Sequence, residues 1–224
     1  MSKQRQNPEK TFVNNRFAPM SAKTEAQKKY FNALANFAIV FGVGPAGTGK
    51  TACSVSHACQ ELHFGRIEKI VITRPLVEAC NENIGFLPGT LEEKQSPYLV
   101  PVKVIMDKVL GKSTVDMHIK EGRIEGVPLA FCRGRTFDNA HIILDEAQNT
   151  NPEQMLMLLT RIGANSKVFI NGDSEQSDTL GLNGLDDAIR RISWMPSVKC
   201  VEFSLDDIVR SYLISDIIKS YRHK

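Results

Sequence analysis

The chain alternates short apolar runs with longer stretches in which apolar residues recur every three or four positions. The short runs predict buried strands, and the longer stretches predict helices with one apolar face. The expected strands are residues 37–43, 69–73, 124–131, 141–144, 167–171 and 197–203. The expected helices are one that starts near Thr24 and residues 51–62, 99–110, 152–163, 185–194 and 206–221. Because strands and helices alternate over the whole body, we expect a three-layer α/β fold around a parallel sheet.

Two segments depart from this alternation. Residues 1–22 are polar and weakly basic, with almost no periodic apolar positions, and predict a mobile N-terminal arm before a single domain at residues 23–224. Residues 78–127 carry turn signals and are too long for a plain connection. We expect this second segment to be a functional insertion or a helical cap that contains the helix at 99–110.

The first predicted strand leads into the sequence GPAGTGKT, which matches the phosphate-loop pattern G-x-x-x-x-G-K-[ST] at every fixed position. A helix is predicted directly after it, so the loop lies between a strand and a helix N-terminus, where backbone N–H groups and the helix dipole favour phosphate. A glycine-rich turn without a ligand is the alternative, and the strand–loop–helix context argues against it. The residues expected to bind the nucleotide are Gly44, Pro45, Ala46, Gly47, Thr48, Gly49, Lys50 and Thr51.

Specific chemistry is expected of four side chains in two motifs. Lys50 would reach the β- and γ-phosphates, and the Thr51 hydroxyl would bind Mg²⁺. The strand at 141–144 ends on Asp145-Glu146, about a hundred residues after the loop. Asp145 would hold Mg²⁺ directly or through water, and Glu146 would orient and deprotonate an attacking water. Many strands merely end in acidic residues, but the preceding phosphate loop in the same domain favours the catalytic interpretation.

Glutamines and a strand end are further candidates. Gln27, at the start of the first helix, has a donor and an acceptor that suit the adenine edge, although from the residues alone an exposed helix glutamine is the better explanation. The strand at 167–171 ends on Gly172-Asp173, with Gln176 and Asp178 just beyond. A polar amide there would touch the γ-phosphate and report its loss. A turn-forming Gly-Asp is the alternative, and spacing alone does not separate the two.

Composition sets limits on the class of protein. The 224 residues are 42% apolar and 24% charged, which is ordinary for a folded globular domain and excludes general disorder. A net charge of +3 permits a nucleic-acid partner without arguing for one. Neither a membrane span nor an apolar signal core is visible, so we expect a cytoplasmic protein without membrane association. The odd number of cysteines and the lack of C-x-x-C favour reduced thiols over disulfides or zinc; they are Cys53, Cys59, Cys80, Cys132 and Cys200.

These motifs together resemble the PhoH-like proteins, phosphate-starvation-inducible ATPases related to the first motor domain of superfamily 1 helicases. The resemblance runs in the order of the family from Gln27 to Tyr221, and the GFLPG and RGRT…LDEAQN stretches are its most specific parts. The matching stretches are GPAGTGKT from Gly44, TRPLVE from Thr73, IGFLPGTLEEKQSPYLVP from Ile84, PLAFCRGRTFDNAHIILDEAQNT from Pro128, QMLMLLTRIG from Gln154, GDSEQSD from Gly172 and DIVRS from Asp207.

The resemblance implies a RecA-like P-loop NTPase core, and we expect no appended RNA-binding or nuclease domain. It also implies roles for single residues. Gln27 looks like the glutamine that contacts adenine in helicase-type ATPases. Gln148 and Gln176 look like motif II and motif III residues that couple hydrolysis to nucleic acid, and Arg74 resembles the motif Ia position near a single strand. Because no N-K-x-D motif follows, adenine is favoured over guanine.

We therefore expect an Mg²⁺-dependent ATPase that acts on RNA or another single-stranded nucleic acid. A regulatory ATPase that switches an RNA-processing partner is the main alternative. A small-molecule kinase shares the phosphate loop, but the Asp145-Glu146 pair argues for an activated water instead. Since one motor domain lacks the arginines of a second, we also expect a homo-oligomeric ring, most simply a hexamer, with Arg161 or Arg210 as the arginine finger of a neighbouring subunit.

Overall fold

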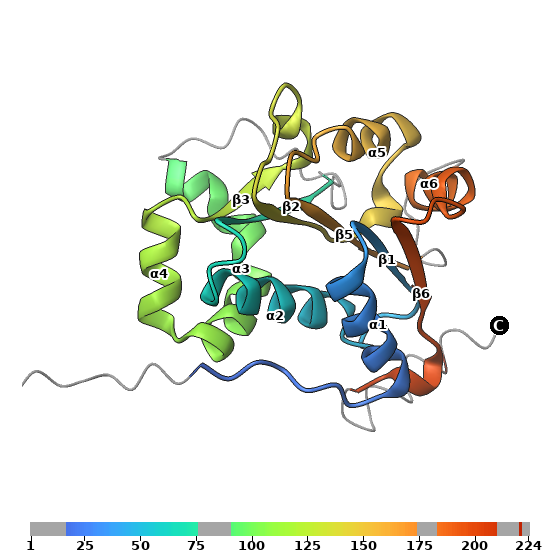
Figure 1. Cartoon of the computed structure of the whole chain (residues 1–224), viewed down its shortest axis with the longest axis horizontal. Coiled ribbons are helices and arrows are strands. Elements are labelled where there is room, and N and C mark those ends of the chain that lie inside the picture. The colour runs from blue at the N-terminus through green and yellow to red at the C-terminus, as the bar shows by residue number, and fades with distance from the viewer. Residues whose placement is uncertain (1–16, 76–90, 174–182, 210–219, 221–224) are drawn as a thin grey trace, which may run out of the picture.

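The computed structural model of the chain describes residues 17–75, 91–173, 183–209 and 220, and is shown in Figure 1. Its centre is a sheet of six strands, which lie in the order β3-β2-β4-β5-β1-β6 and pair in parallel throughout. The predicted parallel sheet is therefore confirmed. The strands are β1 Ile39–Val43, β2 Lys69–Arg74, β3 Ile124–Pro128, β4 Ala140–Leu144, β5 Lys167–Gly172 and β6 Val198–Glu202.

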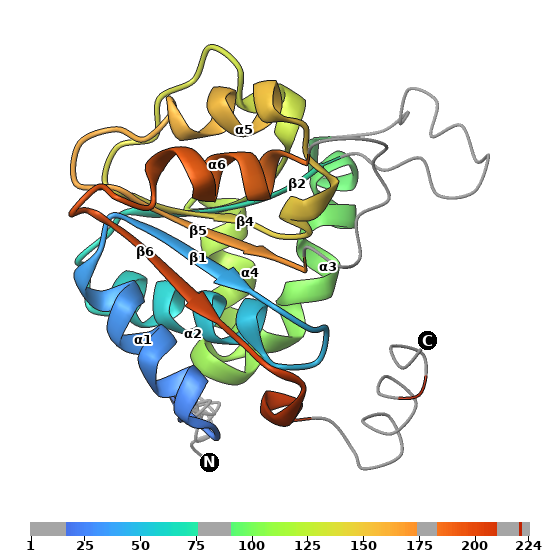
Figure 2. The same ribbon diagram turned by 90° about the vertical axis from the view of Figure 1, so that its right-hand side faces the viewer.

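Helices cover both faces of the sheet, which makes the fold three-layered (Figure 2). On one face lie α1 Glu25–Asn36, α2 Lys50–His63, α3 Leu91–Leu110 and α4 Lys112–Lys120, and on the other lie α5 Pro152–Leu159 and α6 Gly184–Ile192. Each face has its own apolar core. Phe169 of β5 belongs to the first core and Ile170 to the second, because successive side chains of a strand point to opposite faces.

Several helix starts follow directly from polar residues in the sequence. Thr24 caps α1 by accepting a hydrogen bond of 3.2 Å from the backbone N–H of Gln27. Asn151 and Gln154 form a reciprocal capping box at the start of α5, with Pro152 in its first turn. Asn183 caps α6 through the N–H of Asp186. These caps satisfy N–H groups that have no partner inside a helix.

The central strand order determines where the site lies. β5 lies between β4 and β1, so the ends of these three strands are neighbours. In the register of the sheet, Leu144 pairs with Ile170, and Val43 pairs with Gly172. Because all strands run in parallel, the residues that follow β1, β4 and β5 emerge at one edge, which is where ligands bind in open α/β sheets.

The long segment between β2 and β3 contains more helix than expected. Helix α3 starts at Leu91 instead of residue 99, and a further helix, α4 Lys112–Lys120, was not predicted. Gly111, with a φ of 81°, separates the two helices, since a positive φ ends α3 and lets the chain turn. Helix α3 packs against α2 and β3, so the segment forms part of the first layer. Residues 76–90, which include Ala79 and Cys80, lie outside the described part of the chain.

Three predicted element ends were wrong. The strand at 124–131 ends at Pro128 and continues as a 3₁₀ turn, η1 Leu129–Cys132, because proline has no N–H for the ladder. Helix α5 ends at Leu159, four residues before the predicted end at 163. The helix predicted at 206–221 does not start there. Residues 205–207 form a 3₁₀ turn, Ile208 is extended, and residues 210–219 and 221–224 are outside the described residues.

The arm prediction does not hold for residues 17–22. The Phe17 ring stacks on the His63 ring with centroids 4.2 Å apart. The N–H of Ala18 donates to the carbonyl of Val109 in α3, and the N–H of Met20 donates to Ser56 Oγ in α2. This segment therefore ties α2 to α3. Residues 1–16 lie outside the described part of the chain. Among the helices described, none has the length and apolarity that a membrane crossing requires.

Candidate nucleotide-binding site

The phosphate loop lies between β1 and α2, and its backbone adopts positive φ values that favour glycine. Gly44, Gly47 and Gly49 have φ values of 137°, 85° and 85°. A Cβ atom at Gly44 would lie 2.2 Å from the carbonyl oxygen of Phe203, and one at Gly49 would lie 2.8 Å from Gln27 Nε2. The loop is therefore packed from outside by two other segments, and only glycine fits at these positions.

Lys50 folds back across the loop that it follows. Its ammonium donates hydrogen bonds to the carbonyl oxygens of Gly44 at 2.6 Å and Pro45 at 2.8 Å, and to Thr48 Oγ1 at 3.3 Å. The Phe203 ring centroid lies 5.9 Å away. Lys50 is buried yet lines a cleft of about 440 Å³ together with Gly47, so its charge is centred where phosphates would enter.

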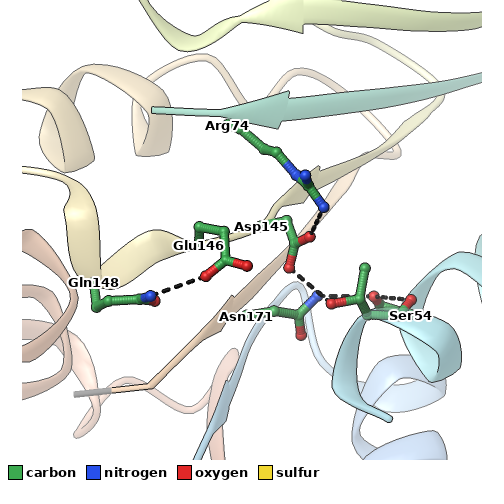
Figure 3. Close-up of polar contacts among 7 residues, drawn as sticks. Ser54, Arg74, Asp145, Glu146, Gln148 and Asn171 are labelled. Atoms are coloured by element: carbon green, nitrogen blue, oxygen red, sulfur yellow. Dashed lines mark hydrogen bonds and ion pairs between the residues drawn. The ribbon is translucent and has the colours of Figure 1, made fainter. Parts of the chain in front are cut away.

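The hydroxyl of Thr51 and the carboxylate of Asp145 meet across this cleft. Thr51 Oγ1 donates to Asp145 Oδ1 at 2.7 Å, and Arg74, from the end of β2, forms an ion pair with Oδ2 (Figure 3). Asp145 is buried, and its backbone N–H donates to the carbonyl oxygen of Thr73 at 3.0 Å. The predicted pair of Mg²⁺ ligands is thus assembled by strands β2 and β4 and the start of α2.

Glu146 has an unusual backbone and a defined partner. Its φ of 56° is left-handed, which turns the chain sharply after β4. Gln148 Nε2 donates to Glu146 Oε2 at 2.9 Å (Figure 3). Gln148 Oε1 accepts from the backbone N–H of Asp173 at 3.1 Å. A Cβ at Gly172 would lie 3.0 Å from that same Gln148 oxygen, so glycine permits the contact. Gln148 therefore links the expected general base to the end of β5.

A buried polar chain lies beneath the cleft. Tyr30 of α1 donates its hydroxyl to Asn171 Oδ1 at 2.5 Å, and Asn171 Nδ2 donates to Ser54 Oγ of α2 at 2.9 Å. Burial raises the pKa of the Tyr30 phenol well above its usual range. Asn171 lines the cleft, so the amide expected at the end of this strand is present there. Sequence reasoning missed Tyr30 and Ser54, whose only signal is a polar group within an apolar helix face.

Gln27 does not point freely into the cleft. It is fully buried, its Nε2 donates to the carbonyl oxygen of Thr48, and its Oε1 accepts from the backbone N–H of Lys23, both at 2.8 Å. The amide therefore supports the phosphate loop. An adenine contact of the predicted kind would have to replace or share the Lys23 contact, so that role stays a prediction.

The remaining catalytic candidates are not part of this cleft in the described chain. Arg161 precedes β5 and so lies toward the amino ends of the strands, at the edge opposite the phosphate loop. Its guanidinium donates to the carbonyl oxygen of Arg135 at 3.3 Å and to Thr160 Oγ1 at 3.1 Å. Gln176 and Arg210 lie outside the described residues.

The donor set fits a magnesium nucleotide. A hydroxyl and a carboxylate oxygen are the protein ligands that Mg²⁺ uses when phosphates and water supply the rest. Within the described ranges, no group of three or more His, Cys, Asp or Glu side chains could hold a metal by itself. Thr51 and Asp145 would therefore hold the ion jointly with a nucleotide, whose phosphates would lie against the glycine backbone and Lys50.

Comparisons with known proteins agree with this fold. The PhoH-like protein family model matches residues 19–222. A PhoH-like protein of Bacillus subtilis (strain 168) is 46% identical over 201 residues, which cover 89% of this chain and 63% of that protein. Protein PhoH of Escherichia coli (strain K12) is 40% identical over 208 residues, covering 91% and 58% respectively. The chain thus spans about three fifths of the length of these two relatives.

A solved structure shows the same fold at low sequence identity. The large terminase from a thermophilic bacteriophage, in complex with ADP, superposes with a TM-score of 0.51 and 11% identity, over 90% of this chain and 50% of that chain. That likeness concerns the arrangement of the P-loop NTPase fold. The family model matches a range that includes both predicted nucleotide motifs, and the two curated relatives cover 89% and 91% of the sequence. The chain therefore belongs to the PhoH-like protein family.

Proposed function

We propose that this chain is an Mg²⁺-dependent ATPase that acts on RNA or another single-stranded nucleic acid. The observation that carries the ATPase part is the contact of Thr51 with Asp145 in a cleft that Lys50 also lines. A P-loop, a metal-binding carboxylate and an adjacent Glu146 are the parts that phosphoryl transfer to water requires. Adenine is proposed over guanine because the sequence has no N-K-x-D motif.

Each side chain then has a defined task. Lys50, now bonded to the carbonyl oxygens of Gly44 and Pro45, exchanges these neutral acceptors for charged phosphate oxygens, which make stronger hydrogen bonds. Glu146, oriented by Gln148, accepts a proton from the attacking water. When bound, Mg²⁺ neutralises charge on the phosphates. No covalent intermediate is needed, because the transfer depends on positioning and electrostatics.

The test is the product of ATP turnover, with and without single-stranded RNA or DNA. We expect ADP and free phosphate in equal amounts, at a rate that single strands increase. A phosphorylated small-molecule acceptor in place of free phosphate would contradict hydrolysis and favour a kinase. Turnover that no single strand changes would contradict the nucleic-acid part alone.

A regulatory ATPase is the second candidate, and Gln148 is the observation that favours it. This residue joins Glu146 to the Asp173 backbone, so a shift at the end of β5 would move the general base without any strand passing through the protein. Such a protein would switch an RNA-processing partner. ATP-dependent binding to that partner, together with turnover insensitive to single strands, would favour this function over the first.

We also propose that the active form is a homo-oligomeric ring, most simply a hexamer. Arg161 lies at the edge opposite its own cleft, so it would reach a nucleotide only in a neighbouring subunit, as a head-to-tail ring allows. Phe131 and Leu156, which are 67% and 64% exposed, lie on the adjoining elements η1 and α5 and would supply apolar contact area. Arg210 is the alternative finger.

Subunit mixing tests the ring. Lys50→Ala subunits have an intact finger and Arg161→Ala subunits have an intact phosphate loop, so mixtures should regain activity that neither variant has alone. Repeating the mixing with Arg210→Ala subunits in place of Arg161→Ala subunits shows which of the two arginines is the finger. Sedimentation at working concentration should show the oligomer. A monomer with full ATPase activity, or mixtures that never regain activity with either arginine variant, would contradict the ring.

A further inference from the structure

The carboxylate expected to bind metal already carries a cation. Thr51 Oγ1 donates to Asp145 Oδ1, and the Arg74 guanidinium forms an ion pair with Oδ2. Both oxygens of Asp145 are therefore engaged, one by a hydroxyl and one by a full positive charge. A divalent cation cannot approach Oδ2 while the guanidinium remains there, because two like charges would share one ligand atom.

The sheet builds this contact into the fold. Arg74 is the last residue of β2 and Asp145 directly follows β4, and these strands pair in parallel with Thr73 opposite Leu144. The N–H of Asp145 donates to the Thr73 carbonyl oxygen at 3.0 Å. The hydrogen-bond ladder between β2 and β4 thus continues up to the Arg74–Asp145 ion pair. The pairing of β2 with β4 thus places Arg74 beside Asp145, with or without a metal ion or nucleotide in solution.

Burial makes a counter-ion at this position necessary. The Asp145 side chain is 7% exposed, and a carboxylate removed from water without a partner is costly. The Arg74 side chain is 24% exposed and lines the cleft together with Lys50. The buried Arg74 Nε has no hydrogen-bond partner within the described part of the chain. The guanidinium thus pairs with Asp145 through Nη2, while the residue lines the cleft that would admit phosphate.

We propose that Arg74 is a built-in counter-ion that occupies Asp145 in the metal-free protein, so that a divalent cation binds only by displacing it. This inference rests on the proposed magnesium-nucleotide function and adds a regulation to it. Displacement by the ion alone loses an ion pair, so the protein without nucleotide binds metal weakly. With a nucleotide present, phosphate oxygens offer the released guanidinium new acceptors, which suit its planar fork of donors. Metal and nucleotide binding are thereby coupled through Arg74.

Manganese binding to the protein without nucleotide tests this directly, with Mn²⁺ followed by electron paramagnetic resonance. Arg74→Gln should bind Mn²⁺ at least about tenfold more tightly than the parent, on the scale of a partly buried charge contact. Adding Asp145→Asn should remove that gain. Arg135→Gln is the matched control, since it also removes an arginine from an ion pair, at 2.6 Å from Glu125, and should leave the affinity unchanged. Equal or weaker Mn²⁺ binding by Arg74→Gln would overturn the proposal.

A second measurement covers the case in which Arg74→Gln does not fold. In the ¹⁵N-labelled parent, the Arg74 Nε–H signal, assigned by its loss in Arg74→Lys, should shift with Mg²⁺ and ADP and stay in place with ADP and EDTA. An unchanged signal under both conditions would overturn the counter-ion role. ATP affinity of the parent, measured in parallel, separates the two claims. A parent that binds MgATP without a change at Arg74 contradicts this inference only, and a parent that binds no ATP contradicts the proposed function.

Discussion

The hydroxyl of Thr51 donates a 2.7 Å hydrogen bond to Asp145 Oδ1, although 94 residues separate them in the chain. The contact arises because β1 and β4 flank β5 and all three end at one edge of the sheet. A phosphate loop and an acidic strand end are each common, and here the fold brings them into direct contact.

Replacing Glu146 by glutamine should separate binding from turnover. The amide keeps the shape of the side chain but does not accept the proton of the attacking water. We expect ATP affinity near that of the parent and turnover lower by roughly two or more orders of magnitude, the usual scale for a general base. Isothermal titration and phosphate release measure the two quantities.

Glu153→Gln is the control for this change. Glu153 is an exposed acidic residue in the first turn of α5, so its substitution removes the same charge away from the cleft. It should leave both affinity and turnover unchanged. Weakened ATP affinity with near-normal turnover in Glu146→Gln would assign Glu146 to binding instead of proton transfer.

Gly44→Ala should destabilise the protein far more than Gly65→Ala. Both glycines have positive φ, 137° and 67°, so both substitutions strain the backbone. The new methyl group at Gly44 would lie 2.2 Å from the backbone carbonyl of Phe203, whereas nothing lies within 4 Å at Gly65. We expect the Gly44 variant to lose about 2 kcal/mol more of its unfolding free energy. Equal denaturant midpoints for the two variants would show that the loop does not pack on Phe203.

Acid should weaken the fold through two buried histidines. Burial lowers the pKa of His57 to about 4 and that of His141 to about 3, from the usual 6.5, and their rings stack 5.5 Å apart. Above pH 6.5 both histidines are neutral in the folded and in the unfolded chain, so their burial does not lower the free energy of unfolding through protonation. As pH falls from 6.5 toward 3, the unfolded chain binds protons first, and stability is lost, by about 2 kcal/mol per histidine at pH 5.

Urea unfolding at pH 7.5 and pH 5 checks this effect. His57→Leu and His141→Leu should each reduce the difference in unfolding free energy between the two pH values, whatever their absolute stability. His63→Leu replaces an exposed histidine and should keep the parental difference. If all three variants retain the full difference, the buried pair does not set the acid sensitivity.

Much of this fold could be predicted because the sequence carries local signals. The strand before Gly44 and the start of α5 at Pro152 each depend on immediate neighbours in the sequence, so pattern and spacing suffice. The start of α3 could not be predicted in this way. The pattern predicts a helix at 99–110, but α3 begins at Leu91 and continues through Pro101, where it packs on α2 and β3.

The candidate site likewise combines features that local motifs predict with contacts that they do not predict. The loop and the Asp145-Glu146 pair follow from motifs, and parallel strands predict that they share an edge. The contact of Arg74 with Asp145 depends on β2 being the neighbour of β4, and local sequence patterns do not predict the order of strands in a sheet. The bond from Tyr30 to Asn171 spans 141 residues and needs the complete packing of α1 on the sheet. Contacts between residues so far apart in the sequence can be identified only once the fold is known.

Release of free phosphate from ATP by the parent and by Lys50→Ala, in Mg²⁺ and in EDTA, tests the central claim most directly. Lys28→Ala, which removes an exposed lysine paired with Glu25, is the control. The account predicts Mg²⁺-dependent turnover by the parent and the control, and background release by a Lys50→Ala variant whose circular dichroism spectrum matches the parent. Turnover at the parental rate by folded Lys50→Ala, or an undiminished parental rate in EDTA, would contradict it.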